Sequence, residues 1–368
     1  MKGKVLIAAF IFALLFCASA YAGVYAISNG NVYKFSEGTN SWVNLGKPGN
    51  GATVINAKGS TLIARAGTDI YAYSNAAVWE LKGSMGSSLG DIDAMYDSSI
   101  GRDRWYSLNG NTVYMNSTGT ANDWASRGSP GDATSEIEAG NGDDVFAVAA
   151  PSYSAFSYLN SGGTGWTEIG RNDTVSKLDS FGGTLVGAYF STAYKYNNSY
   201  GWTDLGRPAG FLTTVAAVAT DGSIYWALAG GDAYRYSSGS WPNLGNPGSN
   251  ISEIHAFSGK VYARKGSDNT LYRYDSSWVQ LGSLSAVTAF SAGPAIANPN
   301  QPPAATNVNI TPSPAYDANT LTCNYTYTDP EGNPEGTSTY RWAKNGTWQT
   351  GQTTKTLNAN NTTTGDNW

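Results

Sequence analysis

The sequence predicts an all-β fold: a seven-bladed β-propeller with circular strand closure, followed by a second, smaller β module. Three observations predict it. A phrase of Trp, three further residues and Gly recurs at intervals of 36 to 45 residues. Each phrase is preceded by short alternating segments in the same order, and the two ends of the repeat region each hold part of one repeat. A period near forty residues with one Trp strand per repeat is typical of a four-stranded propeller blade.

The Trp phrase predicts the outermost strand of each blade, and its Gly predicts the turn that ends this strand. A branched aliphatic residue usually precedes the Gly, as in Trp42-Val-Asn-Leu-Gly46. We expect these Trp side chains to pack in the core rather than stack on sugars, because they belong to the repeat itself. The phrase begins at Trp42, Trp79, Trp124, Trp166, Trp202, Trp241 and Trp278.

A second phrase predicts the innermost strand of each blade: an aliphatic residue, a variable residue, then Ala or Ser. Small residues suit this strand because neighbouring blades converge on the axis, where little volume remains. The phrase reads Ile55-Asn56-Ala57, Ile92-Asp93-Ala94, Ile137-Glu138-Ala139, Leu178-Asp179-Ser180, Val215-Ala216-Ala217, Ile254-His255-Ala256 and Val287-Thr288-Ala289.

The two middle strands of each blade show alternation. One example is the segment 260–264, and another is Tyr272-Arg273-Tyr274, in which aromatic residues flank a polar one. A period of two with β-branched and aromatic residues is typical of half-buried strands.

The two ends of the repeat region predict how the ring closes. Residues 24–27 form a second strand with no inner strand before it, whereas residues 286–290 form an inner strand with no blade after it. We expect residues 286–291 to pair with residues 24–28. The last segment then completes the first blade and removes two sheet edges.

The ends of the chain and its composition predict an exported protein. The N-terminus predicts a secretory signal peptide, because Lys2 and Lys4 precede an apolar run and small residues follow it around position 22. The apolar run is too short to span a bilayer, so an integral membrane protein is not expected. A Pro-, Asn- and Ala-rich segment after the repeats predicts a linker. We predict four parts: a signal peptide at 1–22, the propeller at 23–293, the linker at 294–305 and a second module at 306–368.

Two resemblances accompany these patterns. The Trp-x-x-Leu-Gly phrase and the Tyr-Arg-Tyr strands of residues 23–293 resemble the tectonin and tachylectin type of propeller, which implies non-enzymatic recognition, commonly of glycans. Cys323, followed nineteen residues later by Trp342, resembles the immunoglobulin-like modules of surface proteins. Such modules need about a hundred residues, so we expect residues 306–368 to be a truncated immunoglobulin-like module.

The middle residue of each inner-strand phrase is the candidate ligand-binding position. Because a buried unpaired carboxylate is costly, these side chains should face a water-filled axial funnel or form hydrogen bonds between blades. The hydrogen-bonding role is favoured, and the sharper hypothesis adds a cation such as calcium, or a small polar ligand, near three of the acids. The acidic loop 329–335 could also hold calcium, although a solvated turn is favoured there. The polar candidates are Asn56, Asp93, Glu138, Asp179, His255 and Thr288.

These patterns favour a secreted or cell-surface binding or adhesion protein whose propeller is an interaction platform for an unknown surface protein or glycan. A glycan-binding lectin is the alternative, and a propeller enzyme such as a lyase or glycosidase is less favoured. The single histidine, His255, has no nucleophile phrase beside it, and the ligands of a zinc site are lacking. The net charge of −5 and the scattered basic residues make nucleic acid an unexpected partner. No catalytic residue and no cofactor other than calcium is expected.

Overall fold

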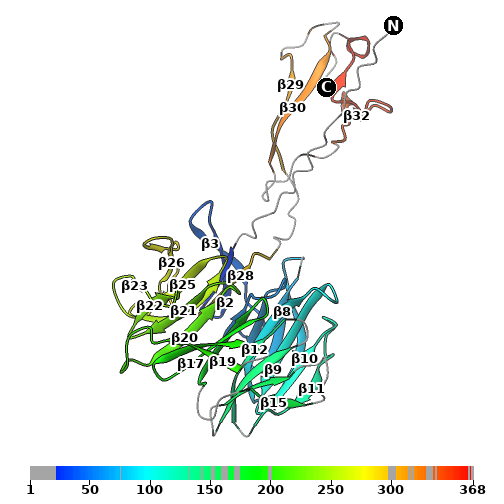
Figure 1. The fold of residues 1–368 in the computed structure, drawn as a ribbon. Coiled ribbons are helices and arrows are strands. Elements are labelled where there is room, and N and C mark those ends of the chain that lie inside the picture. The colour runs from blue at the N-terminus through cyan, green and yellow to red at the C-terminus, as the bar shows by residue number, and fades with distance from the viewer. Residues whose placement is uncertain are drawn as a thin grey trace, which may run out of the picture. The chain divides into compact units, whose positions relative to one another are not determined.

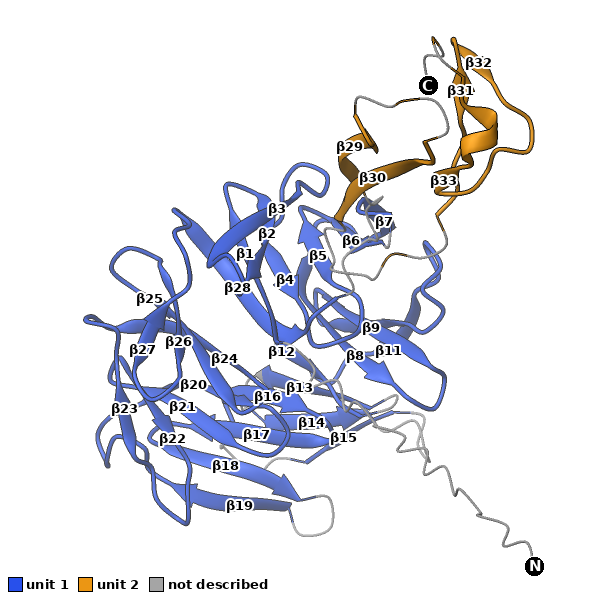
Figure 2. Ribbon diagram, turned by 90° about the horizontal axis from the view of Figure 1, so that it is seen from above, with its two compact units in different colours: residues 1–296 blue, residues 297–368 orange. Residues whose placement is uncertain are grey.

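The computed structural model divides into two compact units, residues 1–296 and residues 297–368 (Figures 1 and 2). Most of the predicted signal peptide, most of the predicted linker and most of the acidic loop lie outside the described residues. The described residues are 22–74, 76–131, 133–141, 144–150, 154–158, 165–169, 175–197, 201–296, 304–313, 316, 319–328, 335, 338–363 and 365.

Unit 1 is all-β, and its described residues form seven four-stranded antiparallel sheets. In six of them the four strands follow one another along the chain. These six are β4(Val54–Asn56), β5(Ile63–Ala66), β6(Asp69–Tyr73), β7(Trp79–Ser84); β8(Leu89–Asp97), β9(Arg102–Asn109), β10(Thr112–Asn116), β11(Ala125–Gly128); β12(Ala133–Ala139), β13(Val145–Ala150), β14(Ser154–Tyr158), β15(Trp166–Glu168); β16(Lys177–Phe181), β17(Thr184–Tyr189), β18(Thr192–Asn197), β19(Gly201–Gly206); β20(Val215–Thr220), β21(Tyr225–Ala229), β22(Asp232–Arg235), β23(Asn243–Gly245); and β24(Ile251–Phe257), β25(Lys260–Lys265), β26(Leu271–Tyr274), β27(Trp278–Gln280).

The seventh sheet joins the two ends of unit 1. It has the order β28(Val287–Pro294), β1(Ala22–Ser28), β2(Asn31–Ser36), β3(Ser41–Gly46). β28 pairs antiparallel with β1, with Tyr25 opposite Ser291. The pairing extends to Ala22 and Pro294, and Ile296 packs on unit 1, where its backbone N–H donates to the Tyr25 hydroxyl at 2.8 Å. Residues 294–296, expected in the linker, therefore belong to unit 1.

The sheets of unit 1 lie around a common centre (Figure 2). Their inner strands contact one another in the order β28, β4, β8, β12, β16, β20, β24 and again β28. Each hydrophobic cluster lies between neighbouring sheets; one example joins Trp226 and Leu228 to Ile254 and Val261. Because every sheet is covered on both faces, its strands carry apolar residues on both faces, and stability comes from the packing of sheet on sheet.

The outer-strand Trp residues connect each sheet to the one before it. Every indole N–H donates to a backbone carbonyl of the preceding sheet, at 2.7 to 3.1 Å, and the acceptor is the residue before the Gly of that sheet's Trp phrase. Trp42 of the first phrase donates to Leu281 of the last. The spacing of the phrase therefore has a physical cause. The Trp donates a hydrogen bond to the preceding sheet, and the residue three positions after it accepts one from the Trp of the following sheet.

Most of these Trp side chains also contact an aromatic ring of the adjacent strand, with ring centroids 5.1 to 5.6 Å apart. Trp202 is buried, and the other six are half-buried. The expectation that they pack internally holds, but their burial is less complete than that of core residues such as Trp226.

Unit 2 is a small β structure. β29(Ala304–Thr311) pairs with β30(Leu321–Thr328), which pairs with β33(Thr356–Leu357), and β31(Ala343–Lys344) pairs with β32(Thr347–Trp348). Its apolar core is Leu321, Trp342 and Leu357, with Cys323 packed against it. Cys323 is a free thiol. The described residues of unit 2 thus form a three-stranded and a two-stranded sheet with one small core, and the immunoglobulin-like assignment stays a prediction.

The described part of the chain contains no helix that is long and apolar enough to cross a bilayer.

Candidate functional site

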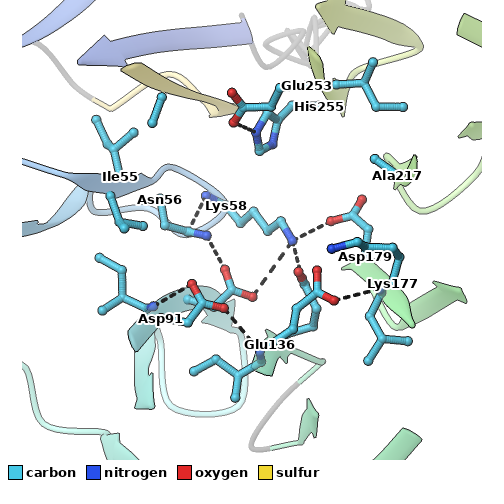
Figure 3. Close-up of a pocket in the computed structure, with 18 of the residues that line it drawn as sticks. Ile55, Asn56, Lys58, Asp91, Glu136, Lys177, Asp179, Ala217, Glu253 and His255 are labelled. Atoms are coloured by element: carbon cyan, nitrogen blue, oxygen red, sulfur yellow. Dashed lines mark hydrogen bonds and ion pairs between the residues drawn. The ribbon is translucent and has the colours of Figure 1, made fainter. Parts of the chain in front are cut away.

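A cavity of about 380 Å³ lies at the centre of unit 1, where the inner strands converge (Figure 3). Alternate residues of an inner strand point to the same side, and β8, β12, β16 and β24 each place two polar residues on the cavity. The deep tier is Asn56, Asp93, Glu138, Asp179 and His255, and the mouth tier is Asp91, Glu136, Lys177, Ala217 and Glu253.

Burial shows where the cavity opens. Asn56, Asp93 and Asp179 of the deep tier are buried, whereas Lys177 of the mouth tier is exposed. The adjoining Ser252, which also lines the cavity, is exposed as well. The cavity therefore opens at the N-terminal ends of the inner strands.

The structure brings together five of the six polar residues that the sequence singled out, and Thr288 is not among them. Thr288 is exposed at a register shift of β28, where Ser28 is opposite Val287 and Ile27 is opposite Ala289. Ser291 takes the equivalent place in the seventh sheet. The same register shift lies three residues before Asp93, Glu138 and His255 in their strands, so Thr288 has the place of the bulge residue. The segment 290–292 aligns with the other inner-strand phrases, but it begins with Phe290 and not with an aliphatic residue, so the phrase was matched three residues too early.

The same correction applies in β20. Ala216 sits at a register shift between Val215 and Ala217 and is exposed. Ala219 occupies the equivalent position, because the backbone N–H of the next residue, Thr220, donates to Asp179 Oδ2 at 2.6 Å. The phrase in this blade is thus Val218-Ala219-Thr220.

The deep-tier side chains hold neighbouring sheets in register. Asp93 Oδ2 accepts the backbone N–H of Ala139 at 2.6 Å, and Ser291 Oγ accepts the N–H of Ala57 at 3.1 Å. Asp179 accepts from Thr220 in the same way. These bonds are the inter-blade hydrogen bonds that the sequence predicted as one of two roles, and they satisfy backbone donors that would otherwise be buried without a partner.

The mouth tier repeats this arrangement one step outward. Asp91 Oδ2 accepts the N–H of Ile137 at 3.2 Å, and Glu136 Oε2 accepts the N–H of Leu178 at 3.3 Å. Asp91 and Asp93 of β8 therefore bind two alternate backbone donors of β12, and Glu136 of β12 binds one donor at the start of β16.

Lys58 supplies a cation to the deep tier. Its side chain is 8% exposed, and its Nζ lies 2.6 Å from Asp179 Oδ1 and 3.9 Å from Asp93 Oδ2. The same ammonium also pairs with Glu138 Oε2. Burial opposes the charge of Lys58, but the three carboxylates outweigh it and raise its pKa well above the ordinary value. Lys58 is therefore a charged group that links three neighbouring sheets at the axis.

Burial shifts two of the mouth-tier acids, Asp91 and Glu136, toward neutrality. It raises the pKa of Asp91 to about 6 and that of Glu136 to about 7, and the repulsion between these two groups adds to the shift of Glu136. In the deep tier, burial and the surrounding carboxylates raise the pKa of Glu138 well above its ordinary value. The cavity therefore holds protons near neutral pH and offers groups that can exchange them.

His255 lies on the other side of the cavity from Lys177. Its Nε2 is 3.2 Å from Glu253 Oε1, and its ring packs edge-on against Phe290 at 4.6 Å between centroids. Arg264 pairs with Glu253 at 2.9 Å. Burial opposes ionisation of Glu253, but the hydrogen bonds from His255 and Arg264 lower its pKa. Glu253 is thus an ionised mouth-tier carboxylate with two cationic or polar neighbours.

Within the described residues, no group of three or more His, Cys, Asp or Glu side chains has an arrangement that could hold a metal ion. The hypothesis of a cation or small polar ligand near Asp93, Glu138 and Asp179 stays a prediction. The structure places the ammonium of Lys58 among these three acids, so an added cation would compete with it.

The sequence predictions missed Lys58 and the mouth tier. Asp91, Glu136 and Glu253 each lie two residues before a predicted site residue, so strand alternation alone could have placed them on the same face. Lys58 follows Ala57 in a loop and has no counterpart in the other repeats. Nothing in the repeat pattern indicates that its side chain reaches the axis.

No family model matches the sequence, and no curated protein matches it. Solved structures do resemble the fold. A structure of streptogramin B lyase matches with a TM-score of 0.52 and 11% identity, covering 65% of this chain and 85% of that chain. A structure of YCF48 bound to a D1 peptide matches with a TM-score of 0.51 and 11% identity, covering 66% of this chain and 86% of that chain.

A propeller-like, all-β repeat fold is therefore shown. At 11% identity the likeness concerns the fold alone. The sheets of unit 1 are accordingly called blades from here on.

Proposed function

We propose that this chain is an exported, cell-surface binding protein whose unit 1 is a closed seven-bladed propeller serving as a platform for a protein partner. The observation that carries the proposal is the use of the repeated Trp residues. All seven indoles donate into the preceding blade, so the repeated aromatic residues build the scaffold.

Closure of the ring is supported by contacts between the last and first blades. Besides the pairing of β28 with β1, Arg273 forms an ion pair with Glu37, and the N–H of Gly282 donates to Asn40 Oδ1 at 3.1 Å. Val24 and Phe35 share a hydrophobic cluster with Leu281. A ring without a free inner edge is a rigid support for binding residues on its loops.

A protein partner is favoured over a set of repeated glycan sites. A lectin with equivalent sites in each blade would present the same aromatic residue in every repeat. The exposed aromatic side chains of unit 1 include Tyr96, Phe190 and Phe211, which occupy different positions in their blades. A tectonin-like lectin is the alternative, with unequal sites.

One observation favours a second candidate function, a lyase or other propeller enzyme. Asp91 and Glu136 have pKa values of about 6 and 7 and face one cavity, as general acids and bases do. One solved structure of similar fold is a streptogramin B lyase. However, one oxygen of each carboxylate is already bound to the backbone of the next blade.

The test is binding of the labelled whole chain to intact cells of the source organism and to a glycan array. Protease treatment of the cells should abolish binding if the partner is a protein. Binding that survives protease but is lost after glycosidase would establish the lectin alternative. Failure of the chain to bind either the cells or the array would refute the binding platform. A catalytic activity of the wild-type chain that is lost in Glu136→Gln would establish the second candidate function, the enzyme.

A further inference from the structure

An exposed apolar patch lies at the rim of unit 1. It consists of Phe190, Phe211 and Leu212, which are 54%, 66% and 85% exposed. Phe190 is in the turn between β17 and β18, and the other two are in the connection between β19 and β20. Large apolar side chains gathered on adjoining exposed segments are typical of interaction sites.

The backbone at this patch keeps the aromatic side chains presented. Phe190 has a φ of 50°, a left-handed conformation in which Gly or Asn is usual and a bulky residue is rare. A bulky residue held in such a conformation suggests a functional constraint. The guanidinium of Arg207 lies over the Phe211 ring, 4.4 Å from its centroid, and restrains that ring.

The patch adjoins the mouth of the axial cavity. Ala188, two residues before Phe190, pairs in register with Lys177 of the mouth tier. The carbonyl of Phe190 accepts the backbone N–H of Val215 at 2.6 Å, and Ala217, two residues further along that strand, lines the cavity. Two residues of a strand span about 7 Å, so the backbone at Phe190 lies close to the cavity mouth.

The cavity has an excess of acidic groups over basic ones. Lys58 and Lys177 are the lysines among the residues that line it, and Lys58 is already bound by three acids. Glu253 is ionised, and a cation entering the mouth would favour the ionised forms of Asp91 and Glu136, so the mouth complements a positive charge. The acidic lining residues are Asp91, Asp93, Glu136, Glu138, Asp179 and Glu253.

We propose that this face binds a segment of a partner polypeptide that inserts a Lys or Arg side chain into the cavity and places apolar side chains on Phe190, Phe211 and Leu212. The inference deepens the proposed binding function and rests on it. Charge complementarity at the mouth selects the cationic side chain, and the adjacent patch selects the apolar ones. The long aliphatic stem of Lys or Arg suits a cavity whose walls also include Val54, Ile55 and Val218.

The test is selection of a displayed library of random linear peptides on the whole chain, followed by affinity measurement of the enriched peptides. Two variants disable the two halves of the surface. The patch variant is Phe190→Asn with Phe211→Ser and Leu212→Ser, where Asn tolerates the left-handed backbone. The cavity variant is Asp91→Asn with Glu136→Gln, which keeps the shape of both side chains. The matched control is Val78→Ser with Leu81→Ser, because these residues are 51% and 48% exposed on another blade.

Enriched peptides should carry one Lys or Arg with aromatic or aliphatic neighbours. Their affinity should fall about tenfold or more in each test variant and stay unchanged in the control. Melting curves of all variants establish that each is folded before its affinity is compared.

Three results would overturn the inference. This surface would be excluded as the peptide site if no peptide is enriched, if the enriched peptides lack a basic residue, or if their affinity is the same in both variants as in the wild type. Binding of the whole chain to cells would then still support the proposed platform. Binding to phosphatidylglycerol vesicles that is lost in the patch variant would instead assign the patch to a lipid surface.

Discussion

Replacing Lys58 tests whether this side chain is the central electrostatic link of unit 1. Lys58→Met keeps most of the aliphatic stem and removes the ammonium, which leaves Asp93, Glu138 and Asp179 without their shared cation. Breaking a buried ion pair by removing one partner costs about 3–5 kcal/mol, because the remaining charge stays buried. For a domain of this size that loss corresponds to a decrease in melting temperature of about 10 °C.

The effect should depend on pH in a defined direction. Lys58 lowers the pKa values of Asp93 and Glu138, which burial raises, so these two values rise further without the ammonium and folding requires both groups to bind protons. The stability lost in Lys58→Met should therefore be largest near pH 8 and smaller near pH 5, where the carboxyl groups are protonated. Thermal unfolding followed by circular dichroism across this range measures it.

Two matched variants make the result specific. Lys82→Met removes a surface ion pair with Glu80 at 2.8 Å and should cost less than about 1 kcal/mol. Adding Glu138→Gln to Lys58→Met removes one unpaired carboxylate and should restore part of the lost stability. If Lys58→Met melts like the wild type at every pH, or if Glu138→Gln does not improve it, the link at the axis does not exist as described.

Four further predictions follow from the blades and the cavity. Trp202→Ala should lower the free energy of unfolding by about 3–5 kcal/mol, because it removes buried surface and leaves a cavity. Trp202→Phe should lower it by about 1 kcal/mol, the net value of the hydrogen bond to Ile169. Chemical denaturation compares the two variants, and equal losses would contradict the packing described. Burial raises the pKa of Asp91 to about 6 and of Glu136 to about 7, so the stability from these groups is fully present below their lower unfolded-state values and is lost as the pH rises through 6 and 7. The melting temperature should therefore be higher near pH 5 than near pH 8, and Asp91→Asn with Glu136→Gln should flatten that difference; an unchanged slope in the double variant would show that other groups cause it. Deleting the chain from Leu284 onward removes β28 and exposes the edge of β1. The shortened chain should therefore melt at a lower temperature and aggregate more than a chain that ends at Ile296. Equal melting curves and equal light scattering of the two chains would refute ring closure. Calcium should leave the melting temperature of the wild type unchanged, because Lys58 already lies among the three acids, and should raise that of Lys58→Met; a clear rise in the wild type would reveal a cation site independent of Lys58.

The repeat pattern was sufficient to predict the order of strands. The Trp phrase, the inner-strand phrase and the alternating strands between them predicted repeated four-stranded antiparallel sheets, and the structure confirms these. It also pairs residues 287–294 with residues 22–28, close to the segments that the incomplete ends of the repeat region indicated. Such features are local: side chains alternate along a strand, and one hydrogen-bonded Trp per sheet imposes a spacing that is visible in the chain itself.

The candidate site was predictable only in part. Asp93, Glu138 and Asp179 were identified because buried acids on inner strands require partners, and the partners are backbone N–H groups of the next blade together with Lys58. Thr288 was placed in the site because the inner-strand phrase was matched three residues before the segment that carries Ser291. Both segments alternate small and larger residues, and only the pairing between strands shows which of them lies level with the other inner-strand residues.

The sequence by itself determined the sheets, their order and three of the acids that line the axis, Asp93, Glu138 and Asp179, because these depend on alternation within single strands. Only the tertiary structure decided that Lys58 pairs with those three acids, that Ser291 replaces Thr288, and that Phe190 and Phe211 lie near the cavity mouth. Each of these depends on distances between blades that are far apart in the chain. Such distances are set by the packing of one sheet against the next, and a repeat pattern carries no information about them.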